Sequence, residues 1–335
     1  MSLSIRAALA LLPLALLPLA LLPLAGCAHA QAPLQAGQAG QPDGRLSLPD
    51  ARRGFATTLL VKNKNTDPVP QPPAGFQLVH YHAPLGDFPA YLTVPPPGTG
   101  RHPAIIWIAG GFSNSIGDDP WAPATPDNDQ SARAFPQAGI ITMYPSLRGG
   151  NNNPGFNECL YGEVDDILAA AHFLALQPNV DPARIYLGGH STGGTLALLV
   201  AESTSGFRAV FSFGAVPSVG AYGRDSLPFD PDNKKELYLR APVLYMNTIE
   251  RPTYVFEGTE DPGNVDVLRK MCSLCTNPNI HFYEVPGLNH FSELAPVTPV
   301  VASEIARDTG PTPHFSFLLA KPKIVPMPQQ QEMPQ

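Results

Sequence analysis

The sequence is short of positive charge. Its 335 residues include 21 lysines and arginines against 28 aspartates and glutamates, so the net charge is −7 and the isoelectric point is near 5.7. A protein that binds nucleic acid usually carries a basic stripe that neutralises phosphates, and no such stripe is available here. The composition therefore excludes nucleic acid as a partner.

The sequence also has few long stretches that are free of proline and could form long helices. It contains 40 prolines in 335 residues, whereas typical usage is roughly 5%. Proline clashes with the preceding helical turn and has no N–H donor, which excludes a coiled coil or a long-helix protein. The hydrophobic fraction of 44% is near the globular norm, so the chain as a whole is not disordered.

The first 27 residues have the layout of a bacterial export signal. Arg6 is a lone positive charge ahead of an apolar run over 7–25, and prolines within that run disfavour a membrane-spanning helix. The run closes on Leu-Ala-Gly-Cys, which resembles the lipobox, where cleavage before the cysteine precedes its lipidation. We therefore predict a signal peptide over 1–26 and a lipid anchor on Cys27. The protein would lie in the bacterial cell envelope, and the absence of Asp at position 28 favours the outer membrane.

Three further cysteines follow, Cys159, Cys272 and Cys275. In an exported chain we expect a disulfide among them, with the pairing undecided. Nothing around the C-x-x-C pair looks like thioredoxin, so redox chemistry is not expected. Three cysteines cannot build a four-cysteine zinc site, and we predict no metal.

The rest of the chain divides into three parts. Residues 27–74 are rich in Gln, Gly, Pro and Ala and predict a flexible tether, with one short ordered stretch over 55–61. Residues 321–335 predict a disordered tail. Residues 75–320 predict one globular domain, which begins with a hairpin of strands over 76–81 and 90–94.

Strands and helices then alternate within that domain. Strands are expected over 104–109, 140–144, 185–188, 209–213, 252–257 and 281–285, and helices over 129–137, 163–176, 195–202 and 298–308. The last helix is expected to start at Thr298, as the capping residue, with Pro299 in its first turn. Such alternation predicts an α/β fold with a mostly parallel central sheet and helices on both faces.

One motif stands out for chemistry. Gly189-His190-Ser191-Thr192-Gly193 is a G-x-S-x-G sequence placed after a predicted strand and before a predicted helix. A serine at such a sharp turn projects its hydroxyl above the sheet, and small neighbours are needed where the strand and helix meet. We predict Ser191 as a nucleophile, with the N–H of Thr192 directed at a developing oxyanion.

A nucleophilic serine needs a base and an acid, which follow it in the order acid, then histidine, on this fold. Asp261 lies just beyond the strand over 252–257 and is the predicted acid, with Glu260 as its rival. His290 follows the next strand and is the predicted base. His281 and His314 are weaker candidates, because one starts a strand and the other lies beyond the last helix.

The oxyanion hole needs a second N–H donor, usually from a loop after an early strand. Gly110 and Gly111 leave the strand over 104–109 in that position. We predict the N–H of Gly111 or Phe112 as the donor, without distinguishing the two. The alternative is that the two glycines only make a turn.

These residues support a family resemblance over about 75–310. Residues 103–112, 144–150, 162–174 and 180–185, leading into the serine turn, resemble the catalytic domain of the prolyl oligopeptidases and the related dienelactone hydrolase-like esterases, all α/β-hydrolases. The resemblance implies hydrolysis of an ester or a short peptide through an acyl-enzyme, without a cofactor.

Two departures from the prolyl oligopeptidases weaken the peptidase prediction. Their usual β-propeller is not expected in a chain with about 45 tether residues before the fold, and Ala109 stands where their oxyanion loop has histidine. Carboxylesterase and small peptidase are therefore rival predictions. Acyl transfer, and a non-catalytic surface lipoprotein on this fold, are the further alternatives.

Overall fold

The computed structural model describes residues 46–317 apart from Pro96 and Thr99, together with residues 325–326. The predicted signal peptide and the lipidation site at Cys27 lie outside the described residues. Within the described part of the chain, no helix combines the length and the apolar character needed to cross a membrane.

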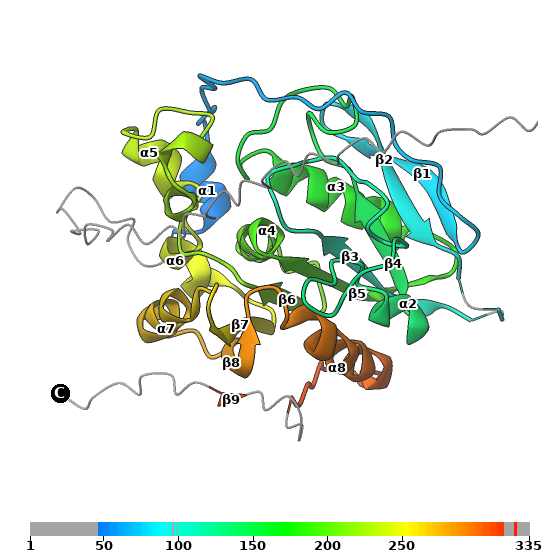
Figure 1. Ribbon diagram of the computed structural model, residues 1–335. Coiled ribbons are helices and arrows are strands. Elements are labelled where there is room, and N and C mark those ends of the chain that lie inside the picture. Colours follow the sequence, from blue (N-terminus) through cyan, green and yellow to red (C-terminus); the bar gives the residue numbers. More distant parts are fainter. Residues whose placement is uncertain (1–45, 96, 99, 318–324, 327–335) are drawn as a thin grey trace, which may run out of the picture. The chain divides into compact units, whose positions relative to one another are not determined.

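The centre of the fold is a twisted sheet (Figure 1). Its strands in chain order are β1 (Phe76–Ala83), β2 (Gly86–Thr93), β3 (His102–Ile108), β4 (Ile141–Pro145), β5 (Val180–His190), β6 (Val210–Phe213), β7 (Thr253–Glu260), β8 (Ile280–Asn289) and β9 (Val325–Pro326). Their spatial order is β1-β2-β4-β3-β5-β6-β7-β8-β9. The run from β4 to β8 is parallel, and the β1–β2, β2–β4 and β8–β9 pairs are antiparallel. This confirms the predicted mostly parallel sheet with its entry hairpin.

Helices cover both faces of this sheet (Figure 1). The main ones are α2 (Ala134–Gln137), α3 (Glu163–Ala175), α4 (Thr192–Ala201), α7 (Val265–Leu274) and α8 (Leu294–Arg307). Residues of α3, α4 and α7 belong to one hydrophobic core, and residues of α2 and α8 belong to another. The two cores lie on opposite faces of the sheet, as the alternating side chains of β3 show. Ala104, Ile106 and Ile108 pack into the first core, whereas Ile105 and Trp107 pack into the second.

A long connection over 214–251 joins β6 to β7. It contains the short helices η1 (Val219–Tyr222), η2 (Arg224–Ser226), α5 (Lys234–Tyr238), α6 (Pro242–Tyr245) and η3 (Met246–Thr248). Figure 1 shows this connection beside α4, and α6 contacts α4. Arg240 is fully buried within it and pairs with Glu236 at 2.5 Å.

Several boundaries differ from the predictions. The helix expected over 129–137 is formed only over Ala134–Gln137, and α7 was not predicted. Helix α8 begins at Leu294, so Pro299 lies inside it rather than in its first turn. The Thr298 hydroxyl donates to the Leu294 carbonyl at 2.9 Å, one turn back in the helix, and is therefore not a cap.

The segment predicted as a flexible tether is packed onto the domain from residue 46 onward, so this prediction is wrong over 46–74. Helix α1 (Leu48–Arg52) buries the Leu48 side chain completely. The Arg52 guanidinium donates to the carbonyls of Tyr161 and Leu239, each at 2.8 Å. The segment is held because an apolar side chain and a five-donor guanidinium both find partners on the domain.

The predicted disordered tail is also wrong at two residues. Val325–Pro326 forms β9 and pairs with Tyr283 and Glu284 of β8. The remainder of 321–335 lies outside the described residues.

Candidate active site

Ser191 occupies the turn between β5 and α4, with φ 56° and ψ −115°. A non-glycine residue held at positive φ costs of order 1–3 kcal/mol and persists where its surroundings over-determine it. Here the Ser191 N–H donates to the Phe213 carbonyl at 2.8 Å, and its carbonyl accepts from the Thr195 N–H at 2.9 Å. The strained serine is therefore held between β6 and the first turn of α4.

The glycines around Ser191 are required by close backbone contacts. A Cβ on Gly189 would lie 2.5 Å from the Gly193 carbonyl oxygen, and a Cβ on Gly193 would lie 2.2 Å from the Ile108 carbonyl oxygen. Side chains at these positions would force β5, α4 and β3 apart. The predicted strand–turn–helix context of the motif is confirmed, together with its steric reason.

The loop after β3 brings the predicted oxyanion donors to the start of α4. Gly111 has φ +99°, and its carbonyl accepts a hydrogen bond from the Thr192 hydroxyl. The Gly110 N–H donates to Gln130 Oε1 at 3.3 Å, whereas neither the Gly111 nor the Phe112 N–H has a partner among the described residues. The Thr192 N–H opens α4, where helical N–H groups have no intrahelical acceptor. All three predicted donors thus lie around one loop junction.

His290 directly follows β8 and is 7% exposed. Its Nδ1 lies 3.3 Å from Glu257 Oε2, 3.4 Å from Glu257 Oε1 and 3.4 Å from Asn264 Nδ2. Gly214, at the end of β6, packs so closely that an added Cβ would lie 2.3 Å from His290 Cε1. The imidazole is thereby confined between β6 and β7.

The structure does not bring Asp261 to His290, which corrects the predicted contact. Asp261 is exposed, and its side chain makes no hydrogen bond or ion pair with any described residue. Strand β7 continues to Glu260, paired with Asn289, so Asp261 falls in the loop beyond the sheet. Glu260, the rival, is exposed as well. The carboxylate next to the imidazole is that of Glu257.

Glu257 was missed, although the sequence carries a signal for it. It is a charged residue inside the apolar strand β7 and is 1% exposed. A carboxylate buried in a strand needs a partner, and a histidine after the neighbouring strand can supply one. A charged residue inside a continuously buried strand, rather than one at the end of the strand, identifies this position.

Ser191 and His290 both border the carboxyl end of β6. Phe213 accepts from the Ser191 N–H, and the next residue, Gly214, abuts the His290 ring. No hydrogen bond joins the Ser191 hydroxyl to His290 among the described contacts. Such bonds are often long before substrate binds and tighten in the complex.

A second buried carboxyl lies three residues after His290. Glu293 is fully buried, and neither of its carboxyl oxygens has a hydrogen-bond partner among the described residues. Burial, followed by the charge of Glu257, raises the pKa of Glu293 well above its usual range. Burial therefore favours the neutral form of the Glu293 carboxyl.

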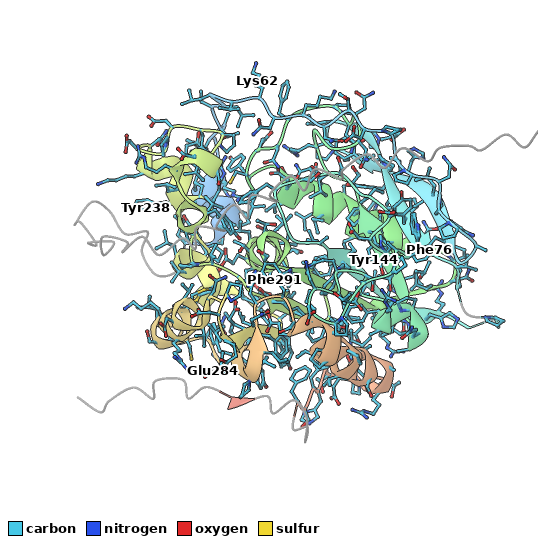
Figure 2. The ribbon with its side chains drawn as sticks, viewed as in Figure 1. Lys62, Phe76, Tyr144, Tyr238, Glu284 and Phe291 are labelled. Atoms are coloured by element: carbon cyan, nitrogen blue, oxygen red, sulfur yellow. The ribbon has the colours of Figure 1, made fainter. Side chains whose placement is uncertain are left out.

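Two exposed phenylalanines come from loops that carry site residues. Phe112, 55% exposed, packs edge-on against Tyr222 of the 214–251 connection at 5.4 Å between ring centroids. Phe291, labelled in Figure 2 and 37% exposed, packs edge-on against His290 at 4.9 Å. Tyr222 in turn shares a 2.6 Å hydrogen bond with the Thr195 hydroxyl, one turn after Ser191.

The predicted disulfide is not formed. Cys159, Cys272 and Cys275 are buried, and no two of them are joined. Cys159 packs with Val219 and Phe229 in a separate hydrophobic cluster, whereas Cys272 and Cys275 point into the main core. Burial raises the pKa of the Cys159 thiol to about 12, so the thiol is protonated and unreactive.

The serine turn on a mostly parallel sheet points to the α/β-hydrolase fold, and comparison with known proteins supports this fold. Residues 127–274 match the model of the prolyl oligopeptidase family, a stretch that includes Ser191 and Glu257 but ends before His290. A polyketide transferase of Penicillium crustosum, claH, is 35% identical over 136 residues, which are 39% of this chain and 42% of that protein. The chain thus spans less than half the length of this curated relative.

Solved structures show the same fold at low sequence identity. A puromycin-hydrolysing peptidase of Mycobacterium tuberculosis superposes with a TM-score of 0.57 at 17% identity, over 72% of this chain and 40% of that one. A 2,6-dihydroxy-pseudo-oxynicotine hydrolase superposes with a TM-score of 0.53 at 15% identity, over 69% of this chain and 67% of that one. The protein has the α/β-hydrolase fold. Within that fold, residues 127–274 resemble the prolyl oligopeptidase family.

Proposed function

We propose that the protein is a serine hydrolase that cleaves an ester or amide bond through an acyl-enzyme. Ser191 is the nucleophile, His290 the base and Glu257 the acid. The observation that carries the proposal is the strained elbow at Ser191, with a buried imidazole–carboxylate pair at the same end of the sheet. The positive φ of Ser191 has a structural cost. A need to project a nucleophile from the sheet explains why this strained conformation is kept.

The residues suggest the following steps. The Ser191 hydroxyl attacks the carbonyl carbon as His290 Nε2 takes its proton, while Glu257 holds Nδ1–H and stabilises the imidazolium. The oxyanion accepts hydrogen bonds from the Thr192 N–H and from Gly111 or Phe112. The tetrahedral intermediate then expels the alcohol or amine, which receives the proton from His290. Water attacks the acyl-enzyme by the same route and releases the acid.

For the substrate, we propose a small ester or amide with an apolar group beside the scissile carbonyl. Exposed aromatic rings on the loops of a site are typical of surfaces that contact ligand. Phe112 and Phe291 provide such rings next to an oxyanion donor and next to the base. The family-model match favours a peptidase, and the fungal polyketide transferase relative favours acyl transfer from a non-peptide substrate.

A panel of substrates tests the proposal. Purified protein is assayed with p-nitrophenyl esters and with aminoacyl-prolyl amides, with and without an alcohol acceptor. We expect hydrolysis that falls by about 10⁴-fold or more in Ser191→Ala. A fluorophosphonate probe should label Ser191 in the wild type. Hydrolysis unchanged in Ser191→Ala would overturn the proposal. Failure of the folded wild type to label would favour a non-catalytic binding protein.

We further propose that the protein is exported and anchored to the envelope by a lipid on Cys27, facing the periplasm or the surface. The support is the apolar run ahead of Leu-Ala-Gly-Cys. Fractionation of cells tests this. The wild type should partition with membranes, and Cys27→Ser should not. Equal partitioning of the two would contradict lipid anchoring.

A further inference from the structure

His190 precedes the nucleophile and is completely buried. Its Nε2 lies 2.8 Å from the carbonyl oxygen of His290, and its Nδ1 lies 2.8 Å from Gln130 Nε2. Its ring packs against that of His290 at 4.6 Å between centroids. Both ring nitrogens of this buried histidine thus have polar partners, and one of these partners is the main chain of the proposed base.

Gln130 fixes the direction of these hydrogen bonds. Its Nε2 donates to Asn128 Oδ1 at 2.7 Å as well as to His190 Nδ1, and its Oε1 accepts from the Gly110 N–H at 3.3 Å. All polar atoms of the amide are thereby used. Because His190 Nδ1 must accept, the proton of the neutral ring is on Nε2, which donates to the His290 carbonyl.

The electrostatics agree with this assignment. Burial, followed by the neighbouring His290, lowers the pKa of His190 to about 3. The ring is therefore neutral at neutral pH and does not compete with His290 for protons. Its role must be geometric, because it has no proton to exchange in the working range.

The hydrogen bonds form one continuous chain between the two halves of the site. It runs from the Gly110 N–H through Gln130 and His190 to the His290 carbonyl. The fit at the junction is close, since a Cβ on Gly110 would lie 2.9 Å from His190 Nδ1 and 3.2 Å from Ser191 Cβ. The chain also uses the Gly110 N–H, which leaves those of Gly111 and Phe112 for the oxyanion.

We propose that Gln130 and His190 are positioning residues that set the oxyanion loop and the loop of His290 at a fixed separation. This inference rests on the proposed hydrolase function. Catalysis through an acyl-enzyme needs the oxyanion donors and the base in register, and a misplacement of about 1 Å can cost on the order of 100-fold in rate. A link through the residue beside the nucleophile keeps both loops in register with Ser191.

The test is a double-mutant cycle with Gln130→Leu and His190→Phe, which keep approximate volume but remove the hydrogen bonds. We expect each to lower kcat by about 10- to 100-fold with a smaller change in KM. The double variant should be no worse than the poorer single variant, because both remove the same chain. His190→Asn, which keeps an acceptor for Gln130, should retain more activity than His190→Phe.

Thr142→Val is the control, because the hydroxyl of Thr142, on β4 and outside the site, makes a buried hydrogen bond to the carbonyl of Ile140 just before that strand. It should lower the melting temperature and leave kcat unchanged. Two results would overturn the inference: a kcat within threefold of wild type in the folded single variants, or losses that multiply in the double variant. Failure of wild-type Ser191 to label with a fluorophosphonate would instead count against the proposed function.

Discussion

The two halves of the candidate site differ in how they are built. The nucleophile half comes from one short stretch, residues 189–194, whose shape is set by contacts among neighbouring backbones. The acid–base half comes from two strands, with Glu257 and His290 separated by 33 positions along the chain. Local steric rules determine the first half, whereas the second depends on where β7 and β8 end and on which side chains point inward.

This difference shows which sequence signals locate a site residue most reliably. A G-x-S-x-G motif places its serine almost by itself, since any larger flanking residue would meet backbone at 2.5 Å or less. An acidic residue near a strand end is a weaker signal. The structure resolves it through burial, with Glu257 inside and Asp261 outside.

The largest effect that separates the two acid candidates is expected at Glu257. Glu257→Gln should lower kcat/KM by about 10²- to 10⁴-fold, because the imidazole loses the carboxylate that orients it and stabilises its charged form. Asp261→Asn is the matched control and should stay within about threefold. Ester hydrolysis by both variants, with circular dichroism to confirm folding, makes the comparison. A large loss in Asp261→Asn alone would restore the acid that the sequence indicated.

A smaller loss of activity is expected when an added side chain at the end of β6 clashes with His290. Gly214→Ala should lower kcat by about 10- to 100-fold, because its Cβ would meet His290 Cε1 at 2.3 Å and displace the ring. Gly54→Ala is the control. Its φ of +71° is close to the +65° of Gly214, but an added Cβ meets nothing within 4 Å. Steady-state kinetics should separate the effect of the clash from the effect of backbone strain. Equal kcat values for the two variants would argue against displacement of His290 by the added Cβ.

At Phe112, the contribution of the side chain can be tested separately from that of the backbone N–H. Phe112→Ala keeps the N–H and should lower kcat/KM about tenfold for esters with large apolar acyl groups, with little change for acetyl esters. The reason is the loss of an exposed ring beside the oxyanion loop. Leu176→Ala, an exposed apolar residue just after α3, is the control. A loss that is independent of acyl size would place Phe112 outside the substrate contact.

The smallest catalytic effect, with a clear effect on stability, is expected at Glu202, which follows α4. Both of its carboxyl oxygens are buried without a partner among the described residues, and burial raises its pKa well above the usual range. Because the folded-state pKa is raised, its contribution to stability is present at low pH and lost as pH rises through the folded pKa. Glu202→Gln should therefore exceed the wild type in stability by about 1–3 kcal/mol at alkaline pH, with the gap closing near pH 4.

Urea unfolding of the Glu202→Gln variant at several pH values measures this gap, with kcat expected to stay unchanged. A gap that does not vary with pH would show that the Glu202 carboxyl is not protonated in the folded state.

Much of the fold followed from the sequence, because buried parallel strands such as β3 are continuous apolar runs. The positions of the proposed oxyanion loop and of the proposed base followed as well, since each lies directly after a predicted strand. Three features did not follow. The packing of 46–74 depends on Leu48 entering the core and on Arg52 finding partners more than a hundred residues away. The start of α8 at Leu294 overrides a cap-and-proline signal at Thr298 and Pro299. The choice of Glu257 depends on the inward face of β7.

The central claim is that Glu257, and not Asp261, holds Nδ1–H of His290. Proton NMR of the low-field imidazole region tests it most directly, with His290→Asn used to assign the His290 signal. The account predicts that this signal persists in Asp261→Asn and is lost or strongly shifted in Glu257→Gln. A signal that is lost in Asp261→Asn and unchanged in Glu257→Gln would contradict it.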